Sequence, residues 1–188
     1  MLTTADNPFY SPEEYLQIEE HSPIKHKYLD GRLYAMVGST QDHNLVVLNL
    51  AFALRRHLRG TGCRVLTSDV KVRVEQRNRF FYPDIAVSCD ERDWATPLYL
   101  RFPRLIVEVL SDSTEAFDRG ARFQDYQTID TLSEYVLVSS KQPQVECFRR
   151  DAEALWVLQS YGLEVYEIGA LNFSGTFEEL YEDVAFLP

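Results

Sequence analysis

Two apolar segments, residues 80–88 and 105–110, constrain the fold of this chain more than any other feature of its sequence. Each is a near-continuous hydrophobic run, which is typical of interior strands that are covered on both faces. Such strands need helices or a second sheet on each side of them. We therefore expect an α/β or α+β fold in which a mixed β-sheet is flanked by helices.

The segments around these two strands predict the covering helices. Apolar residues recur with a helical period over residues 40–59, and the pattern ends at Gly60, so a long helix is expected there. Ser11 begins a capping box that predicts a short N-terminal helix. Asp118 fits the N-cap of a further helix, which is expected to cover residues 118–129.

Additional strands are expected before and after these helices. Asp30-Gly31 is a dipeptide favoured in type I′ hairpins, because both turn residues need positive φ. Valines alternate with charged residues over 70–75, which indicates a half-exposed strand, whereas residues 134–139 have the composition of a buried one. Near the C-terminus, an antiparallel meander is expected from residues 144–149, 155–161 and 164–168.

Size and hydropathy limit the class of protein. The 188 residues fit one domain, and no shift in composition divides residues 1–188. No apolar run approaches the roughly 20 residues that cross a bilayer, so no membrane association is expected. Residues 1–10 lack the pattern of a signal peptide, which makes the cytoplasm the expected location.

The charge balance argues against one class of nucleic-acid binder. A formal net charge of −10 argues against a protein that coats nucleic acid independently of sequence, because such a protein needs a basic surface. The net charge does not exclude a local basic cleft. One basic cluster comprises Arg55, Arg56, Arg59 and Arg64. A solvated face explains this cluster as well as a cleft does.

Cysteine and histidine spacing predicts neither a disulfide framework nor a zinc site. Cys63, Cys89 and Cys147 are odd in number, widely separated and without a CxxC pair. We therefore expect three ordinary thiols in a reducing compartment. The histidines show no HxxxH or HExxH spacing, which excludes a zincin motif.

The candidate chemistry lies in one carboxylate within each apolar segment, Asp84 and Glu108. Burying an unpaired carboxylate costs several kcal/mol, so each needs a cation, a hydrogen-bond network or a proton. One interpretation is that the two face each other and hold Mg²⁺ or Mn²⁺, with a metal-bound water attacking a phosphodiester. The alternative is a buried ion pair of Glu108 with Arg122 or Arg119.

A set of short motifs occurs in one order along nearly the whole chain: Lys25-His26-Lys27-Tyr28-Leu29-Asp30-Gly31, Tyr34-Ala35-Met36, Asp42-His43-Asn44, Tyr82-Pro83-Asp84-Ile85, Glu108-Val109-Leu110-Ser111, Asp118-Arg119-Gly120, Tyr126 and Glu134-Tyr135. Together these motifs resemble the Uma-two family of endonuclease-like proteins in the PD-(D/E)xK nuclease superfamily. The resemblance implies a restriction endonuclease-like core and a metal-dependent nuclease that acts on DNA.

The resemblance assigns roles position by position. Asp84 matches the acid of the PD element, and Glu108 matches the acid of the (D/E)xK element, so both are expected metal ligands. Leu110 stands where the usual lysine would be, and Arg122 matches the lysine that the Uma-like pattern has on the following helix. Lys27 stands where the family commonly has glutamate. Lys27 either replaces the missing lysine or fills the metal site with a salt bridge.

Three further polar positions have two interpretations each. His43 matches the family's histidine, which suggests a phosphate contact or a general base, but a histidine near a helix start also caps or faces solvent. Asp69 could add an oxygen ligand or form a turn. Ser111 could be a nucleophile or a cap, and capping is the preferred explanation because no histidine lies near it in sequence.

Two functions follow from these residues. The first is a Mg²⁺- or Mn²⁺-dependent phosphodiesterase that acts on DNA through Asp84 and Glu108, with Arg122 on the scissile phosphate and His43 at the periphery. The second is a catalytically impaired nuclease fold that serves as a binding or assembly module, with Lys27 and Arg122 neutralising the former site. Exposed strand edges and an aromatic-rich C-terminal half favour a homodimer.

Overall fold

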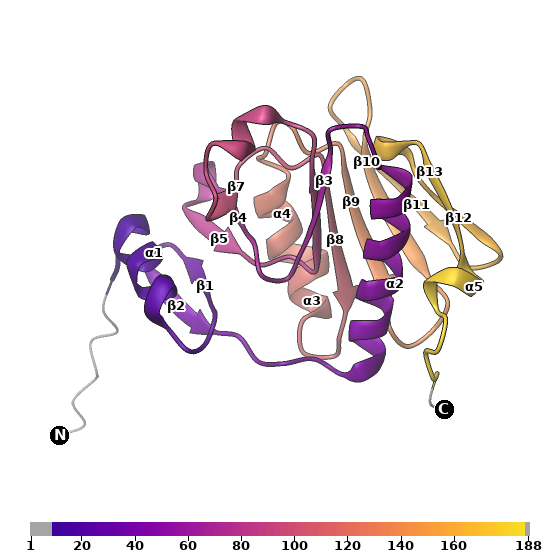
Figure 1. Cartoon of the computed structure of the whole chain (residues 1–188), viewed down its shortest axis with the longest axis horizontal. Helices are drawn as coiled ribbons and strands as arrows, with labels where there is room; N and C mark the ends of the chain where they lie inside the picture. Colours follow the sequence, from indigo (N-terminus) through magenta and orange to yellow (C-terminus); the bar gives the residue numbers. More distant parts are fainter. Residues whose placement is uncertain (1–8, 187–188) are drawn as a thin grey trace.

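The computed structural model describes residues 9–186, which form an α+β fold around a six-stranded sheet (Figure 1). The α-helices are α1 (Pro12–His21), α2 (Gln41–His57), α3 (Glu115–Phe117), α4 (Phe123–Tyr126) and α5 (Phe177–Leu180). The 3₁₀-helical turns are η1 (Glu75–Arg77), η2 (Glu91–Trp94) and η4 (Gly169–Leu171), and η3 (Asp118–Arg122) is a π-helical turn. The strands are β1 (His26–Leu29), β2 (Arg32–Ala35), β3 (Arg64–Thr67), β4 (Lys71–Val74), β5 (Arg79–Phe81), β6 (Ile85–Ser88), β7 (Tyr99–Leu100), β8 (Leu105–Leu110), β9 (Glu134–Ser139), β10 (Val145–Arg150), β11 (Trp156–Tyr161), β12 (Val165–Ile168) and β13 (Phe173–Thr176).

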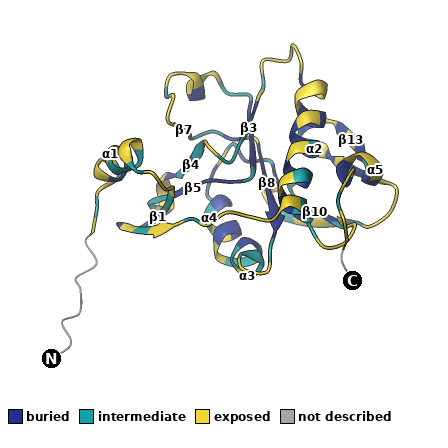
Figure 2. Ribbon diagram, turned by 60° about the horizontal axis from the view of Figure 1, so that its bottom comes forward, coloured by how far each residue is buried: buried dark blue, intermediate teal, exposed yellow. Residues whose placement is uncertain are grey.

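The central sheet has the strand order β11-β10-β9-β8-β6-β3. β8 and β9 are parallel, and the other neighbouring strands are antiparallel. All six residues of β8 are buried, which confirms the expected interior strand (Figure 2). Val107 on one face packs with Leu50 and Leu54 of α2, and Ile106 on the other face packs with Tyr126 of α4.

A second sheet, with the order β2-β1-β5-β4-β7, covers part of the α4 side of the molecule. Its residues Val72 and Phe81 share a core cluster with Ile106 of the central sheet. The expectation of one strand over residues 80–88 is wrong, because β5 and β6 belong to different sheets. Pro83 lies in the bend between them, where its missing N–H costs no ladder hydrogen bond.

The long helix and the first hairpin confirm their sequence signals. The Thr40 hydroxyl caps α2, and the helix ends shortly before Gly60, which has φ +80°. Ser11 forms the predicted capping box of α1. Asp30 and Gly31 have φ values of 48° and 89°, so both turn residues adopt the left-handed conformation that a tight hairpin requires.

The C-terminal half departs from the expectations in two ways. Asp118 is not an N-cap, because the chain is already helical from Glu115. β12 does not continue the antiparallel pair β10 and β11 but pairs with the unpredicted strand β13. Because of this placement, Tyr166 and Ile168 of β12 and Phe177 of α5 belong to the same core cluster as residues of α2. None of the helices in the described range is long and apolar enough to span a membrane.

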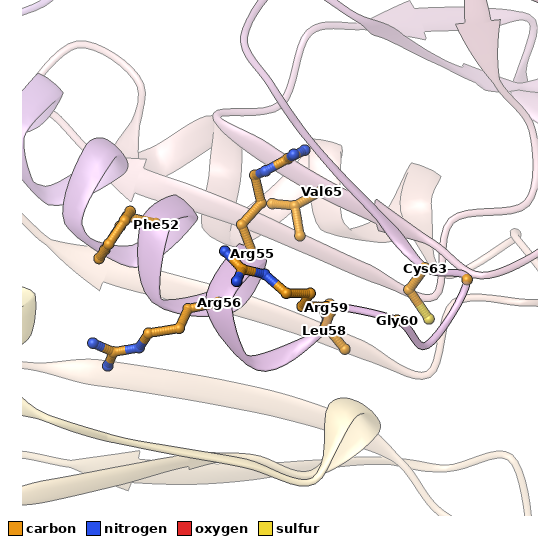
Figure 3. Close-up of a pocket in the computed structure, with 9 residues that line it drawn as sticks. Phe52, Arg55, Arg56, Leu58, Arg59, Gly60, Cys63 and Val65 are labelled. Atoms are coloured by element: carbon orange, nitrogen blue, oxygen red, sulfur yellow. The ribbon is translucent and has the colours of Figure 1, made fainter.

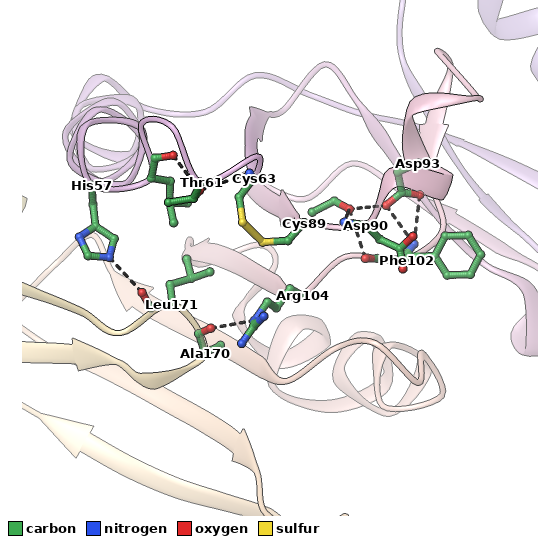
Figure 4. Close-up of a disulfide and its surroundings, with 12 residues drawn as sticks. His57, Thr61, Cys63, Cys89, Asp90, Asp93, Phe102, Arg104, Ala170 and Leu171 are labelled. Carbon is green, nitrogen blue, oxygen red and sulfur yellow. Dashed lines mark hydrogen bonds between the residues drawn. A yellow bond between two sulfur atoms is a disulfide. The ribbon is translucent and has the colours of Figure 1, made fainter.

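Cys63 and Cys89 form a disulfide, so the expectation of three ordinary thiols is wrong for two of them (Figure 4). β3 and β6 are antiparallel with Arg64 opposite Ser88, and one further step in this register places the two cysteines opposite each other. Their separation of 26 residues along the chain hides this proximity. Cys147 remains a free, buried thiol.

Candidate functional site

Strand register brings Asp84 and Glu108 together. In the antiparallel pair of β6 and β8, Ile85 lies opposite Val107, so continuing the register by one residue places Asp84 opposite Glu108. Directly opposite residues of an antiparallel pair project to the same face of the sheet. The main-chain N–H of Val109 donates to Asp84 Oδ2 at 2.8 Å, which fixes the carboxylate at the end of β8.

Arg122 connects two buried carboxylates. Its Nη1 lies 2.9 Å from Glu108 Oε1 and 2.8 Å from Asp118 Oδ1, and all three side chains are less than 10% exposed. Arg122 is thus the ion-pair partner of Glu108, whereas Arg119 pairs with Glu146 and with a neighbouring glutamate of α3. We call Asp84, Glu108, Asp118 and Arg122 the acidic centre.

Aromatic side chains enclose the acidic centre and remove it from water. The Tyr126 hydroxyl donates to Glu108 Oε1 at 3.3 Å, and the Tyr135 hydroxyl donates to the main-chain oxygen of Asp118 at 3.0 Å. The Arg122 guanidinium lies 5.1 Å from the ring centre of Phe117. In a dry surrounding of this kind, Coulomb forces between the charged groups are stronger than at the surface.

The acidic centre is short of positive charge. Burial raises the pKa of Glu108 well above its ordinary value; Arg122 opposes this shift, and Asp118 and Asp84 add to it. Burial likewise raises the pKa of Asp118, with Arg122 again opposing. Two carboxylates on one buried guanidinium, with Asp84 close to Glu108, therefore create a site that favours further cations or protons.

His43 completes the acidic centre from the opposite side of the sheet. Its Nε2 lies 3.3 Å from Asp84 Oδ2, and its side chain is only 11% exposed. Burial lowers the pKa of His43, but the hydrogen bond and the charge of Asp84 raise it more, so the net shift is upward. The solvent-facing interpretation of His43 is therefore wrong, and helix capping comes from the Thr40 hydroxyl.

Lys27 lies near the acidic centre without an ion pair to it in the described part of the chain. Its Nζ lies 4.6 Å from the ring centre of Phe117. Burial lowers the pKa of Lys27, the charge of Arg122 lowers it further, and Asp118 opposes both. Lys27 thus adds positive potential at the edge of the centre, but it does not fill the space between the carboxylates with a salt bridge.

Two other sequence candidates lie outside the centre. Asp69 is 82% exposed in its side chain and pairs with Lys25. The Ser111 and Thr114 hydroxyls hydrogen-bond to each other at 3.0 Å, as expected of turn residues. Sequence reasoning missed Asp118 as a member of the centre, although its spacing of four residues from Arg122 is a signal for a helical ion pair.

The donor set suits a hard divalent cation only in part. Within residues 9–186, no group of three or more His, Cys, Asp or Glu side chains is arranged to hold a metal ion. Asp84 and Glu108 nevertheless come from adjacent strands, and all their described side-chain contacts involve Oδ2 and Oε1. Mg²⁺ commonly takes one or two protein carboxylates and completes its shell with water. Two carboxylates with an oxygen each to spare fit that pattern.

The sequence of this chain is similar to a known family and to two known proteins. Residues 12–176 match the Uma2 (Uma-two) family, described as "Putative restriction endonuclease". "Uncharacterized protein slr1290" from Synechocystis sp. (strain ATCC 27184 / PCC 6803 / Kazusa) is 35% identical over 184 residues, 97% of each chain. "Uncharacterized protein sll1609" from the same organism is 29% identical over 160 residues, 84% of this chain and 90% of the relative.

A solved structure has the same fold at low sequence identity. It is the crystal structure of a "putative nuclease belonging to DUF820" from Anabaena variabilis ATCC 29413, with a TM-score of 0.74 and 11% identity. The similarity covers 92% of this chain and 97% of the other. The family match over residues 12–176 and the similarity to slr1290 over nearly the full length lead to one conclusion: the chain belongs to the Uma2 family.

Proposed function

We propose that this protein is a Mg²⁺- or Mn²⁺-dependent phosphodiesterase that acts on DNA. The observation that carries the proposal is the cross-strand placement of Asp84 opposite Glu108, one carboxylate from each of two adjacent strands. Membership of a family described as restriction endonucleases and a nuclease-like fold support the same reaction class. The reaction adds water across a P–O bond of the backbone, which leaves one phosphate end and one hydroxyl end.

In this proposal Asp84 and Glu108 hold the metal ion. When bound, the ion lowers the pKa of a coordinated water and offsets the charge that develops on the phosphate. Val109 holds Asp84 through its main-chain N–H, and Tyr126 holds Glu108 through its hydroxyl. These contacts keep both carboxylates in place and reduce the reorganisation needed on binding.

The cationic groups take different parts. Arg122 supplies a fixed positive charge beside Glu108, but its very high pKa makes it unsuited to carrying a proton. His43 contacts Asp84 through Nε2, and Asp84 raises the pKa of His43 against the opposing effect of burial, so its protonated form can place positive charge near an incoming phosphate. Lys27, with its lowered pKa, is the remaining group at the edge of the centre that can exchange a proton.

Arg122 also favours a second candidate function, a nuclease fold that binds without cutting. One guanidinium nitrogen of Arg122 already contacts both Glu108 and Asp118. It therefore offsets the negative charge that would otherwise attract a metal ion. In that case the acidic centre would be neutralised by the protein itself. DNA would then be bound or ignored, but not cleaved.

A cleavage assay with matched variants tests the first function. Supercoiled plasmid is incubated with the protein in Mg²⁺ or Mn²⁺, and nicking is followed on gels. Asp84→Asn keeps the shape of the side chain but removes its charge, and cutting is expected to fall at least about a hundredfold. Asp125→Asn is the control, because Asp125 pairs with Arg79 outside the acidic centre. Equal cutting by the parent and by Asp84→Asn would refute the proposal.

Thermal unfolding with added Mn²⁺ distinguishes the two functions. A ligand that binds only the folded state raises the melting temperature by mass action. The phosphodiesterase predicts a rise for the parent that Asp84→Asn abolishes, whereas the neutralised centre predicts no rise. Arg122→Lys sharpens the test, because a lysine restores a compact ammonium that can carry a proton. Higher cutting by Arg122→Lys than by the parent would show that arginine limits the chemistry.

A further inference from the structure

A hollow of about 660 Å³ lies at the C-terminal end of α2, away from the acidic centre (Figure 3). We call it the arginine pocket and define it by Phe52, Arg55, Arg59, Gly62 and Val65, which line it with a few neighbours. Volumes of several hundred Å³ are usual for small-molecule sites. The hollow is therefore large enough for a nucleotide-sized ligand.

The arginine pocket and the acidic centre lie near opposite ends of one helix. Arg55 follows His43 by 12 residues, which corresponds to roughly 18 Å along α2. His43 contacts Asp84, whereas Arg55 contributes to the pocket. A ligand in the arginine pocket would therefore not touch the metal-binding carboxylates of the proposed phosphodiesterase.

The charge in the arginine pocket is not balanced by the protein. Its lining contains three arginines and no carboxylate, in a chain with a net charge of −10. Arg56 extends away from the other two (Figure 3). Its Nη2 lies 3.3 Å from Oε1 of Glu179 in α5. Arg55 and Arg59 have neither an ion pair nor a side-chain hydrogen bond to any residue the structure describes.

The two arginines come from different backbone segments. Arg55 lies in the last turn of α2, which ends at His57, whereas Arg59 lies in the turn that follows the helix. Two guanidinium groups that line one hollow are well suited to an anion with several oxygens, because each can donate a pair of hydrogen bonds. Phosphate is the anion that best matches this fork geometry.

An aromatic ring lies beside the cations. Phe52 is 69% exposed, although its position on α2 is next to buried core residues. Its ring centre lies 5.8 Å from the guanidinium of Arg56, and Phe52 lines the same hollow as Arg55 and Arg59. A large exposed ring in a pocket that also contains unpaired arginines is a combination on which the bases of nucleic acids stack.

The turn after α2 keeps the rim of the pocket open. Gly60 and Gly62 have φ values of +80° and +83°, which side chains other than glycine adopt with strain. No atom lies within 4 Å of where a Cβ would stand at either glycine. The rim therefore leaves main-chain atoms accessible to a ligand.

We propose that the arginine pocket binds a nucleotide, with its phosphates on Arg55 and Arg59 and its base against Phe52. The bound group is either a free nucleotide or the phosphorylated end of a DNA strand, and both present the same chemistry. This site is additional to the acidic centre and does not depend on the protein being a nuclease.

Stabilisation of the helix end is the competing explanation for the arginines. Basic residues in the last turn of a helix interact favourably with its dipole. That role needs neither an exposed ring nor a hollow, and it predicts an effect on stability without an effect on binding. Binding measurements therefore separate the two explanations.

The test is calorimetric titration of the full chain at low salt without divalent metal. The probes are ATP, inorganic pyrophosphate, adenosine and a short 5′-phosphorylated oligothymidylate. Arg55→Gln with Arg59→Gln is expected to weaken ATP and pyrophosphate binding at least about tenfold, because two charge-assisted contacts are lost. Phe52→Ala is expected to weaken ATP binding and to leave pyrophosphate binding unchanged. Arg32→Gln with Arg77→Gln, which removes two exposed charges outside the pocket, is the matched control and is expected to change binding less than about twofold.

The outcomes divide clearly. Tighter binding of ATP than of the oligonucleotide identifies a free nucleotide as the ligand, and the reverse order identifies a strand end. The proposal is overturned if the parent binds none of the phosphate probes, or if adenosine binds as tightly as ATP. Equal losses in the control variant, Arg32→Gln with Arg77→Gln, and in the pocket variant would also overturn it, because the effect would then be one of net charge. Loss of DNA cutting in Asp84→Asn with unchanged ATP binding would leave this site intact.

Discussion

The acidic centre and the arginine pocket differ in the burial and pairing of their charged side chains. In the acidic centre, Glu108 and Asp118 share Arg122 and are almost completely buried. In the arginine pocket, Arg55 and Arg59 are exposed and have no carboxylate near them in the lining. Buried charges must be compensated within the protein, whereas exposed charges can be left for a ligand or for solvent. Charge removal should therefore have large effects on stability in one region and small effects in the other.

The largest effect is expected from Arg122→Met. This change leaves Glu108 and Asp118 buried without their cation, and breaking a buried pair from one side costs about 3–5 kcal/mol. Urea denaturation followed by circular dichroism measures the loss of unfolding free energy. Arg119→Met is the control, because Arg119 is one-third exposed and its ion pairs are worth about 0–1 kcal/mol. Equal losses in the two variants would remove the contrast between buried and exposed charge.

The disulfide supports the edge of the arginine pocket, where Cys63 is a lining residue. Replacing Cys63 and Cys89 with serine is expected to lower the unfolding free energy by about 3 kcal/mol, because the unfolded chain regains the freedom of a 26-residue loop. Denaturation under oxidising conditions measures the difference. Reductant should lower the stability of the parent to the level of the double variant and leave that variant unchanged. A parent that does not respond to reductant contains no such bond.

Local signals in the sequence were sufficient for most of the elements. The recurrence of apolar residues before Gly60 predicted α2, and Asp30-Gly31 predicted the first hairpin, because helix ends and tight turns depend on neighbouring residues. The split between β5 and β6 was missed, because an apolar run has the same pattern whether one strand or two cross it. Pro83 was the available signal for that split.

Features that depend on strand pairing could not be derived from the sequence alone. The cost of burying a carboxylate drew attention to Asp84 and Glu108, but only the register of β6 with β8 places them face to face. The Cys63–Cys89 disulfide likewise depends on the pairing of β3 with β6. Asp118 was assigned to a cap because its partner, Arg122, was considered only for Glu108.

A smaller effect is expected from His43, which links α2 to the acidic centre. The folded state raises the pKa of His43 above 6.5, with burial opposing and Asp84 causing the rise, so folding favours the protonated imidazole. Its contribution to stability is therefore complete below about pH 6.5 and is lost as the pH rises through the folded-state value. We therefore expect the stabilisation that His43 provides to fall between pH 6 and 9.

The comparison with His43→Gln isolates this titration. Unfolding free energies of the two proteins, measured at several pH values, should differ most at low pH and converge as the pH rises. Ionisable groups that do not interact with His43 contribute equally to both curves, so the difference reports His43 together with its contact to Asp84. A difference that stays constant with pH would show that the His43–Asp84 contact is a neutral hydrogen bond.

The smallest effect on stability is expected where the charge is exposed. Replacing Arg55 and Arg59 with glutamine removes one favourable charge from the last turn of α2 and one from the turn that follows it. An exposed charge at a helix end contributes about 0.3–1 kcal/mol, so the unfolding free energy should fall by less than about 1 kcal/mol. Urea denaturation of the double variant checks this, with Arg56→Gln as the reference. A loss near that of Arg122→Met would mean that the two arginines hold the fold together, and the arginine pocket could then not be regarded as a surface kept free for a ligand.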